Sequence, residues 1–336
     1  MILGILFAIL AGVLLGLYAL PEKYTHDFAY ENTWGLFFLI NLIVLPFFVA
    51  TVMIDHFGAV LLSLSPHVLI TMTIASIFWG IGVQLWSKAI DYIGVSLGFS
   101  IFIGTVILVG SILPFIRDGL PNANVLAFII GGLIVILLGV FSNGKAGLLR
   151  SEDKQIDGLK DAQNMGKGIL IAVIGGVLAA GFSLANAVGA NPINEAMLRE
   201  GNPAWKTALA IMVIIYMAGA LYVLPYFIVQ LNKNHTWKRF RTPSFSQNLS
   251  MATIMAVFNF AASVVFAYAA FALGSAGNTV GYAIYNTSSV LFAVIGGIVT
   301  HEWVGTSKGA RLYLYIALWA MATGVILIAV GNALNN

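Results

Sequence analysis

Ten uninterrupted apolar runs dominate this chain, and they restrict its possible folds more than any other feature of the sequence. A run of about 20 apolar residues can cross the ~30 Å hydrocarbon core of a bilayer as a helix. Because the runs are continuous and do not alternate between apolar and polar residues, we expect helices rather than a β-barrel. The runs lie near residues 2–20, 34–54, 68–88, 93–115, 124–142, 168–188, 207–231, 248–272, 279–300 and 312–333.

The overall composition agrees with a membrane protein. Hydrophobic residues make up 60% of the chain and charged residues 9%, whereas a soluble domain carries about 25% charged residues. We therefore expect an all-α membrane protein of ten transmembrane helices, surrounded by lipid. The absence of cysteine excludes disulfides and thiolate metal sites. No spacing of His, Asp or Glu suggests a metal site, and the net charge of +3 does not indicate nucleic acid. We expect neither a metal nor a cofactor.

The basic residues predict how the chain is oriented. All but three of the 16 lysine and arginine residues follow odd-numbered runs, the exceptions being Arg117, Arg199 and Lys206. Basic loops favour the cytoplasmic side, so the odd-numbered loops are expected there and both termini outside. The first run lacks a basic leader and a small-residue cleavage site, which indicates a retained helix. We expect a multi-pass membrane protein.

A sequence repeat suggests that the chain is internally duplicated. Gly168–Leu184 matches Gly4–Leu20 at about half of its positions, at an offset of nearly half the 336 residues. Repeated halves are the usual architecture of secondary transporters. We predict two five-helix repeats, 1–142 and 168–336, joined by a polar cytoplasmic connector, 143–167. Because five crossings is an odd number, the two repeats are expected to be inverted relative to each other.

The polar residues predicted inside the membrane are neutral. All Asp, Glu and His residues fall in loops or near predicted helix ends, which argues against a charged channel ring and against an enzyme with paired titratable groups. Amides and hydroxyls can both donate to and accept from sugar hydroxyls, and aromatic rings can stack on a sugar. The alternative is hydrogen bonding between helices. The candidate substrate-binding residues are Trp79, Gln84, Ser100, Asn186, Asn259, Tyr268, Tyr285 and Asn286.

Glycines and prolines indicate where helices pack closely or bend. Gly80 and Gly82 in the third run would allow another backbone to approach closely. Pro46 and Pro225 lie within apolar runs and are expected to disturb the helices that contain them. Between the third and fourth runs, 88–94 leaves room only for a tight turn.

An ordered set of short segments carries a family resemblance. The segments are Tyr18-Ala-Leu-Pro21 with Lys23, Glu31 and Trp34; Leu45-Pro46; Trp79-Gly80-Ile81-Gly82 with Tyr92-Ile-Gly94, Ser96, Gly98 and Gly104; Lys167-Gly168 through Gly181 and Ser183; Pro192 with Glu195-Ala196; and Gly296-Gly297 with Glu302-Trp303. Together they resemble the bacterial L-rhamnose–proton symporter family of the drug/metabolite transporter superfamily. The resemblance implies ten helices in two inverted repeats, a monomer, and proton-driven import of a six-carbon deoxy sugar.

The chain departs from the family pattern at three places. Gly281 stands where the family has an acidic residue in the ninth helix, and Ser288 stands where it has a histidine about two turns later. In the third helix the family carries small amides near Val83 and Leu85, whereas here the amide is Gln84. These positions are where the resemblance places the handling of substrate and protons.

These observations predict a sugar–proton symporter that works by alternating access. The candidate carboxylates for proton coupling are Glu195, Glu31 and Asp91, although Asp91 could instead form an interfacial ion pair with Lys88. Two alternatives remain from the sequence, a sugar uniporter without proton coupling and an exporter of another metabolite on the same fold.

Overall fold

The computed structural model describes residues 2–120, 122–153, 162–301 and 303–333. This part of the chain is helical and contains no strand. Within it, nine segments are long and apolar enough to cross a membrane, which confirms the prediction of a helical membrane protein. The side chains of two predicted site residues, Ser100 and Asp91, lie outside the described residues.

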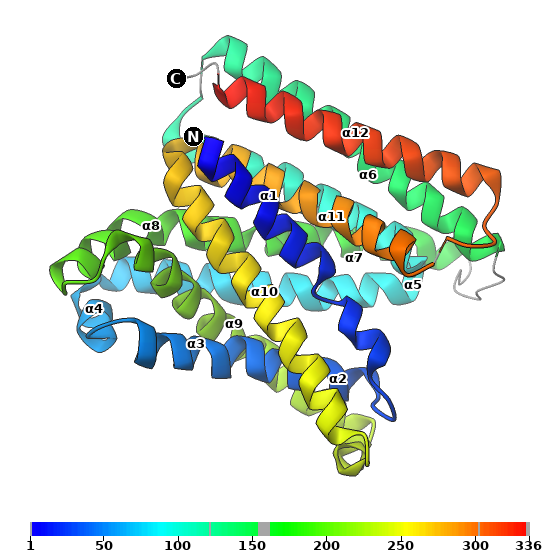
Figure 1. Ribbon diagram of the computed structural model, residues 1–336, viewed down its shortest axis with the longest axis horizontal. Helices are drawn as coiled ribbons and strands as arrows, with labels where there is room; N and C mark the ends of the chain where they lie inside the picture. The colour runs from blue at the N-terminus through cyan, green and yellow to red at the C-terminus, as the bar shows by residue number, and fades with distance from the viewer. Residues whose placement is uncertain (1, 121, 154–161, 302, 334–336) are drawn as a thin grey trace.

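Twelve α-helices follow one another along the described chain (Figure 1). Short 3-10 or π-helical segments, namely Leu20–Tyr24, Ile40–Val44, Val49–Met53, Ala204–Lys206, Thr236–Arg241, Gly274–Ala276 and Gly277–Gly281, join several of them. The helices are α1 (Ile2–Leu17), α2 (Tyr30–Leu39), α3 (Leu45–Phe48), α4 (Phe57–Ser63), α5 (Pro66–Asp118), α6 (Ala123–Asp153), α7 (Ala162–Ala179), α8 (Gly181–Arg199), α9 (Thr207–Lys233), α10 (Phe245–Leu273), α11 (Tyr282–Val299) and α12 (Lys308–Ala333).

Helix α5 contains both the third and the fourth predicted runs and folds back on itself. The rings of Trp86 and Phe102 stack with centroids 5.9 Å apart. A straight helix, rising about 1.5 Å per residue, would separate these positions by about 24 Å. The chain therefore reverses direction between them, where the sequence predicted a tight turn. In the returning limb, the described apolar part is Ile101–Gly110.

Two predicted runs differ from regular α-helices. Around Pro46 the helix changes to π-helical turns, Ile40–Val44 before it and Val49–Met53 after it. This agrees with the expected disturbance, because proline has no backbone N–H to donate. The sixth run was expected to end near residue 188. Instead α7 and α8 continue the helical path to Arg199, with a break at Ala180.

The two segments that match in sequence each pack along long helices. Helix α1, which holds the first copy, packs against both α10 and α11. Helix α7, which holds most of the second copy, packs along α5, where Gly175 lies close to Leu85 on one limb and Phe102 on the other. The remaining long helices pair across the halves, because α6 lies along α12 and α2 contacts α9 (Figure 1).

Glycines make the closest of these helix contacts possible. A Cβ added to Gly82 would lie 2.5 Å from the backbone nitrogen of Ala179 and from the carbonyl oxygen of Gly175. Between α6 and α12, a Cβ on Gly132 would lie 2.9 Å from the Gly324 carbonyl, and one on Gly324 would lie 2.8 Å from the Gly132 carbonyl. Such distances are too short for any side chain, so only glycine permits these crossings.

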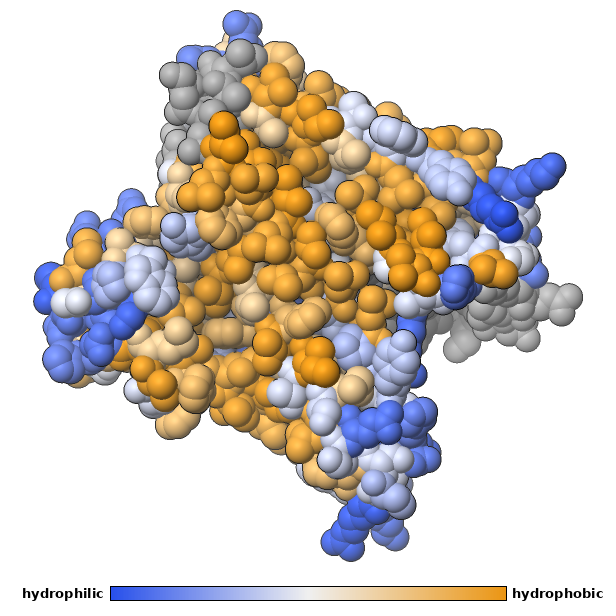
Figure 2. Space-filling model, in the orientation of Figure 1, coloured by the Kyte–Doolittle hydropathy of each residue, from blue (hydrophilic) through white to orange (hydrophobic). Residues whose placement is uncertain are grey.

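The surface shows where lipid and water are expected. Figure 2 shows a broad hydrophobic area across the middle of the molecule, with hydrophilic residues concentrated at its ends. Large apolar side chains such as Leu62, Phe141 and Trp319 are exposed on the surface of the protein. An apolar area much larger than a few hundred Å² marks an interaction surface rather than a water-facing one. The sides of the bundle are therefore apolar enough to face the hydrocarbon of a membrane.

At each end of the bundle, one asparagine side chain forms two hydrogen bonds to the backbone of a loop from the other half of the chain. Asn248 accepts a hydrogen bond from the His26 N–H at 2.9 Å and donates to the His26 carbonyl at 2.7 Å. Asn202 accepts from the Asp55 N–H at 2.9 Å and donates to the Asp55 carbonyl at 2.8 Å. Both asparagines are buried. We call these pairs the Asn248 clamp and the Asn202 clamp.

The segment predicted as the connector, 143–167, is partly helical. Helix α6 continues into it as far as Asp153, and α7 begins within it at Ala162. The Asp153 carboxylate accepts a hydrogen bond from the Ser307 N–H, at the start of α12. The first residues of α1 and the last turn of α12 lie at the opposite end of the molecule from this contact (Figure 1).

An ion pair beside the Asn202 clamp should make stability depend on pH. Lys206 Nζ lies 3.0 Å from Asp55 Oδ2, and this hydrogen bond and charge lower the pKa of the Asp55 carboxyl. A lowered pKa stabilises the folded state above the unfolded aspartate value of about 3.9, and the contribution is lost as pH falls through the folded value. We expect Asp55→Asn to lower the thermal midpoint of purified protein slightly at neutral pH and to have no effect in strong acid. An equal difference at both pH values would contradict this account.

Candidate functional site

A cavity of about 230 Å³ lies in the interior of the bundle. It is smaller than the ~300–1,000 Å³ of sites for drug-sized ligands, which suits a small molecule such as a monosaccharide. Among the described residues that line it, none is Asp, Glu, Lys, Arg or His. Its polar lining consists of Tyr18, Tyr216, Asn259, Ser263, Tyr282, Tyr285, Asn286 and Ser289.

One polar side of the cavity is a hydrogen-bonded cluster centred on the Asn259 amide. Asn259 Oδ1 accepts from the Tyr216 hydroxyl and from Asn41 Nδ2, both at 2.9 Å. The Tyr216 hydroxyl also lies 2.5 Å from Ser263 Oγ. Asn259 itself is half-buried, so these bonds fix the orientation of an amide at the cavity wall.

Helix α11 supplies the other polar side. Tyr282, Tyr285, Asn286 and Ser289 share one face because they follow the three- and four-residue spacing of a helix. Asn286 Nδ2 donates to the Tyr282 carbonyl at 3.0 Å, and Ser289 Oγ donates to the Asn286 carbonyl at 2.7 Å. These bonds hold the side chains against the helix, which sets where their oxygens can meet a ligand.

Aromatic rings form the apolar walls. Trp79 packs against Tyr216 and Phe182, with centroids 5.4 and 5.7 Å apart. Tyr285 stacks on Phe266 at 4.7 Å. Rigid rings next to fixed amides and hydroxyls match a ligand that has an apolar face and several hydroxyl groups.

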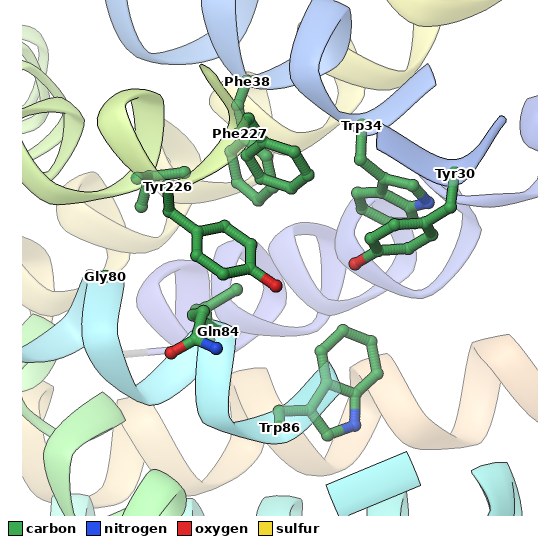
Figure 3. A pocket seen from close by; sticks show the side chains of 10 residues that line it. Tyr30, Trp34, Phe38, Gly80, Gln84, Trp86, Tyr226 and Phe227 are labelled. Atoms are coloured by element: carbon green, nitrogen blue, oxygen red, sulfur yellow. The ribbon is translucent and has the colours of Figure 1, made fainter. Parts of the chain in front are cut away.

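A second, smaller cavity shares part of this wall. Phe38, Val83 and Trp86 line both cavities, while Tyr30, Trp34, Gln84, Tyr226 and Phe227 line the smaller one. Gln84 Oε1 accepts from the Tyr222 hydroxyl at 3.1 Å. Figure 3 shows the Tyr226 hydroxyl directed into this smaller space, toward Gln84 and Trp86.

The cavity brings together half of the predicted substrate-binding residues. Trp79, Asn259, Tyr285 and Asn286 line it, and Gln84 lies in the adjoining smaller cavity.

Two other predicted residues lie apart from the cavities. Asn186 is buried in α8 without lining either cavity, and Tyr268 packs against Phe7, with centroids 5.0 Å apart. Ser100 falls outside the described side chains. The binding roles remain predictions.

Several lining residues were not selected from the sequence. Ser263 follows Asn259 by four residues and Ser289 follows Asn286 by three, so helical spacing alone could have suggested both. The ring of Tyr216 and the end of α1 at Tyr18 come from helices distant in sequence. No sequence pattern indicates that they meet these two asparagines.

Two of the three predicted coupling carboxylates, Glu195 and Glu31, lie apart from the cavity. Glu195 is exposed on α8. Glu31 is buried at the start of α2, where Glu31 Oε1 accepts from Thr236 Oγ1 at 2.6 Å and Asn234 Nδ2 at 3.2 Å. Neither lines a cavity, and the Asp91 side chain is not among the described ones. Their role in coupling stays a prediction.

A membrane-spanning helical bundle around a neutral, aromatic and amide-lined cavity is typical of a membrane transport protein for an uncharged, hydroxyl-bearing small molecule. Comparison with known families agrees. The chain belongs to the L-rhamnose-proton symport protein (RhaT) family, whose model matches residues 1–334. This confirms the predicted resemblance, and the family is one of transporters rather than enzymes.

Individual relatives match over nearly the whole chain. An L-rhamnose-proton symporter of Mannheimia succiniciproducens is 25% identical over 99% of this chain and 98% of the relative. One from Escherichia coli O1:K1 / APEC is 25% identical over 98% of each chain. A third, from Citrobacter koseri, is 29% identical over 69% of this chain and 67% of the relative.

Proposed function

We propose that this chain is a secondary active transporter that imports a neutral monosaccharide, L-rhamnose or a related deoxyhexose, together with protons by alternating access. The cavity carries the proposal, because it combines fixed amides and hydroxyls with aromatic walls and has no charged side chain in its described lining. Such a lining favours an uncharged polyhydroxylated ligand over a sugar acid, a phosphate or an amine. The names of the relatives support the choice of rhamnose and of protons.

An inverted duplication, with repeats 1–142 and 168–336 and connector 143–167, supports the alternating mechanism. The packing of α1 against α10 and α11 parallels that of α7 against the two limbs of α5. If those limbs are counted separately, the helical path makes ten crossings.

Two further pairs of residues share a common offset. Pro46 and Pro225 are 179 positions apart, as are His56 and His235, which is 15 more than the offset of 164 between Gly4 and Gly168. Both histidines have a left-handed backbone, with φ of 53° and 55°. Halves related by an inverted repeat can move against each other, so that a central site is closed first on one side of the membrane and then on the other.

The distribution of basic residues supports an orientation in which the cavity lies toward the cytoplasm. If the odd-numbered loops are cytoplasmic, Tyr18 lies at the inner end of α1, and Phe37 and Phe38 lie in the inner part of α2. The structure then corresponds to a carrier whose site lies nearer the inside, with both termini outside. We propose that it acts as a monomer in the bacterial inner membrane.

A sugar uniporter is the second candidate. The described cavity lining contains no carboxylate and no imidazole. Elsewhere in the same segment, Gly281 and Ser288 stand at the positions where the family resemblance implies an acidic residue and a histidine. A uniporter needs no titratable group, whereas a symporter must have one outside this lining.

Adding sugar to energy-depleted cells that express the protein separates these candidates. We expect L-rhamnose to alkalinise the medium as it enters, and smaller or no effects from L-fucose, D-glucose and D-ribose. Radiolabelled uptake without alkalinisation would show uniport. If no sugar of this panel enters, and none shifts the unfolding temperature of the purified protein, the proposed function is wrong. A matched strain with an empty vector supplies the background.

A further inference from the structure

One carboxylate at the end of α1 contacts an aromatic residue of the cavity wall. Glu22 is half-buried in the 3-10 turn Leu20–Tyr24. Its Oε1 accepts a hydrogen bond of 2.7 Å from the indole nitrogen of Trp34. No sequence pattern pointed to Glu22, because the apolar run that contains α1 ends just before it.

Trp34 connects this carboxylate to both cavities. Trp34 is buried and lines the smaller cavity. Its ring packs edge-to-face on Phe37 at 5.3 Å and on Tyr18 at 6.2 Å, and both of these line the larger cavity. In Figure 3 the indole nitrogen lies on the side of the ring that faces away from Gln84 and Tyr226. The hydrogen bond to Glu22 therefore fixes the Trp34 ring on the side that faces away from Gln84 and Tyr226.

We propose that Glu22 is a proton-binding site that positions Trp34, so that proton binding changes the wall of the smaller cavity and the packing of Trp34 on Phe37 and Tyr18 of the larger one. A carboxylate is a strong acceptor for the indole N–H, whereas a protonated carboxyl is a weaker acceptor and carries a donor of its own. Proton binding at Glu22 thus loosens Trp34, and proton release fixes it. This inference rests on the proposed function, because it supplies the titratable group that a symporter requires.

The charged and titratable groups around Glu22 are few. Tyr18 precedes it by one turn, Lys23 follows it, and Tyr30 and Glu31 begin α2. Lys23 donates to Thr300 at the end of α11. Helix α10 packs against the turn and has no Asp, Glu, Lys, Arg or His between Phe245 and Leu273.

Glu31 provides an informative contrast. Its Oε1 is bound by side chains from the connection between α9 and α10, and neither of these partners is a cavity-lining ring. Glu31 therefore ties two segments together, whereas Glu22 bonds directly to a residue that lines the smaller cavity.

The first test needs no sugar. In protein labelled with ¹⁵N at the indole nitrogens of its seven tryptophans, the Trp34 signal is assigned by its loss in Trp34→Phe. We expect it to shift with pH over about pH 4 to about pH 8, a range that includes the ordinary glutamate pKa of about 4.3. In Glu22→Gln it should not shift. A Trp34 signal that titrates in the same way in Glu22→Gln would overturn the proposal.

The second test measures transport. In proteoliposomes, L-rhamnose counterflow in Glu22→Gln should lose its pH dependence, and accumulation driven by a pH gradient should fall about tenfold, while exchange persists. Trp34→Phe should show the same loss, which keeps the test decisive if one variant folds poorly. Glu152→Gln, which changes an exposed carboxylate at the end of α6, is the matched control and should behave as wild type.

The outcomes distinguish this inference from the proposed function. If wild-type protein transports no sugar of the panel but the Trp34 signal titrates through Glu22, the function is wrong and the proton site stands. If wild-type protein accumulates rhamnose with protons and Glu22→Gln does so equally, the inference is wrong and the function stands. Loss of coupling in Glu195→Gln, with Glu22→Gln unaffected, would assign the proton to Glu195.

Discussion

Asn259→Leu is expected to reduce L-rhamnose uptake into proteoliposomes by at least about tenfold, the equivalent of about 1.4 kcal/mol. Leucine has nearly the shape of asparagine but can neither donate nor accept. The substitution removes the amide from the cavity wall and leaves Asn41 Nδ2 without the acceptor it has at 2.9 Å. A buried donor that loses its partner costs about 1–3 kcal/mol, so the thermal midpoint should fall as well.

Two comparisons separate binding from folding in this prediction. Tyr268→Phe changes a hydroxyl on the same helix, α10, at a position that packs on Phe7 and lines neither cavity, and it should leave uptake unchanged. The unfolding temperature with and without rhamnose reports binding directly. If Asn259→Leu retains both uptake and the rhamnose-induced shift, the Asn259 amide does not contact the sugar.

Gly82→Ala is expected to destabilise the folded protein strongly. The added Cβ would lie 2.5 Å from the backbone of α7 at Gly175 and at Ala179. Backbone atoms cannot rotate away as a side chain can, so α5 and α7 must separate. Overpacking of this kind costs about 1–3 kcal/mol and occasionally more. We expect little monodisperse protein in detergent and a markedly lower unfolding temperature.

Gly131→Ala is the matched control for the glycine prediction. Gly131 lies in α6, and nothing lies within 4 Å of a Cβ added there. Alanine favours a helix over glycine by about 1 kcal/mol, so this variant should be as stable as wild type or more stable. Equal stability of the Gly82 and Gly131 variants would mean that α5 and α7 do not cross as closely as described.

Much of the local structure was predictable because it depends on neighbouring residues. The helices follow from uninterrupted apolar sequence, and the reversal in α5 follows from the short polar interval at 88–94. The close approach at Gly82 follows from the absence of a side chain. Asn259 and Asn286, two of the amides selected from the sequence, line one cavity, whereas Gln84 lines the smaller one, and their role in binding stays a prediction.

What the sequence could not provide was the convergence of distant segments. The sixth predicted run was expected to end near residue 188. In the structure, α8 includes Pro192 and continues to Arg199. Nothing near Tyr216 in sequence indicates that its hydroxyl meets Asn259 and Ser263. Likewise, Glu31 is buried because Thr236, from a distant connection, donates to it. These arrangements depend on how whole helices are placed.

The asparagine clamps have an energetic consequence for a carrier. Each clamp consists of two neutral hydrogen bonds, and each such bond contributes about 0.5–1.5 kcal/mol net. Releasing either clamp therefore costs only about 1–3 kcal/mol, which thermal fluctuation supplies on the microsecond-to-millisecond timescale of domain motion. The two clamps are alike in number and kind, so any preference for opening one end first must come from the bonds beside them, the Lys206–Asp55 ion pair at one end and the Glu31–Thr236 bond at the other.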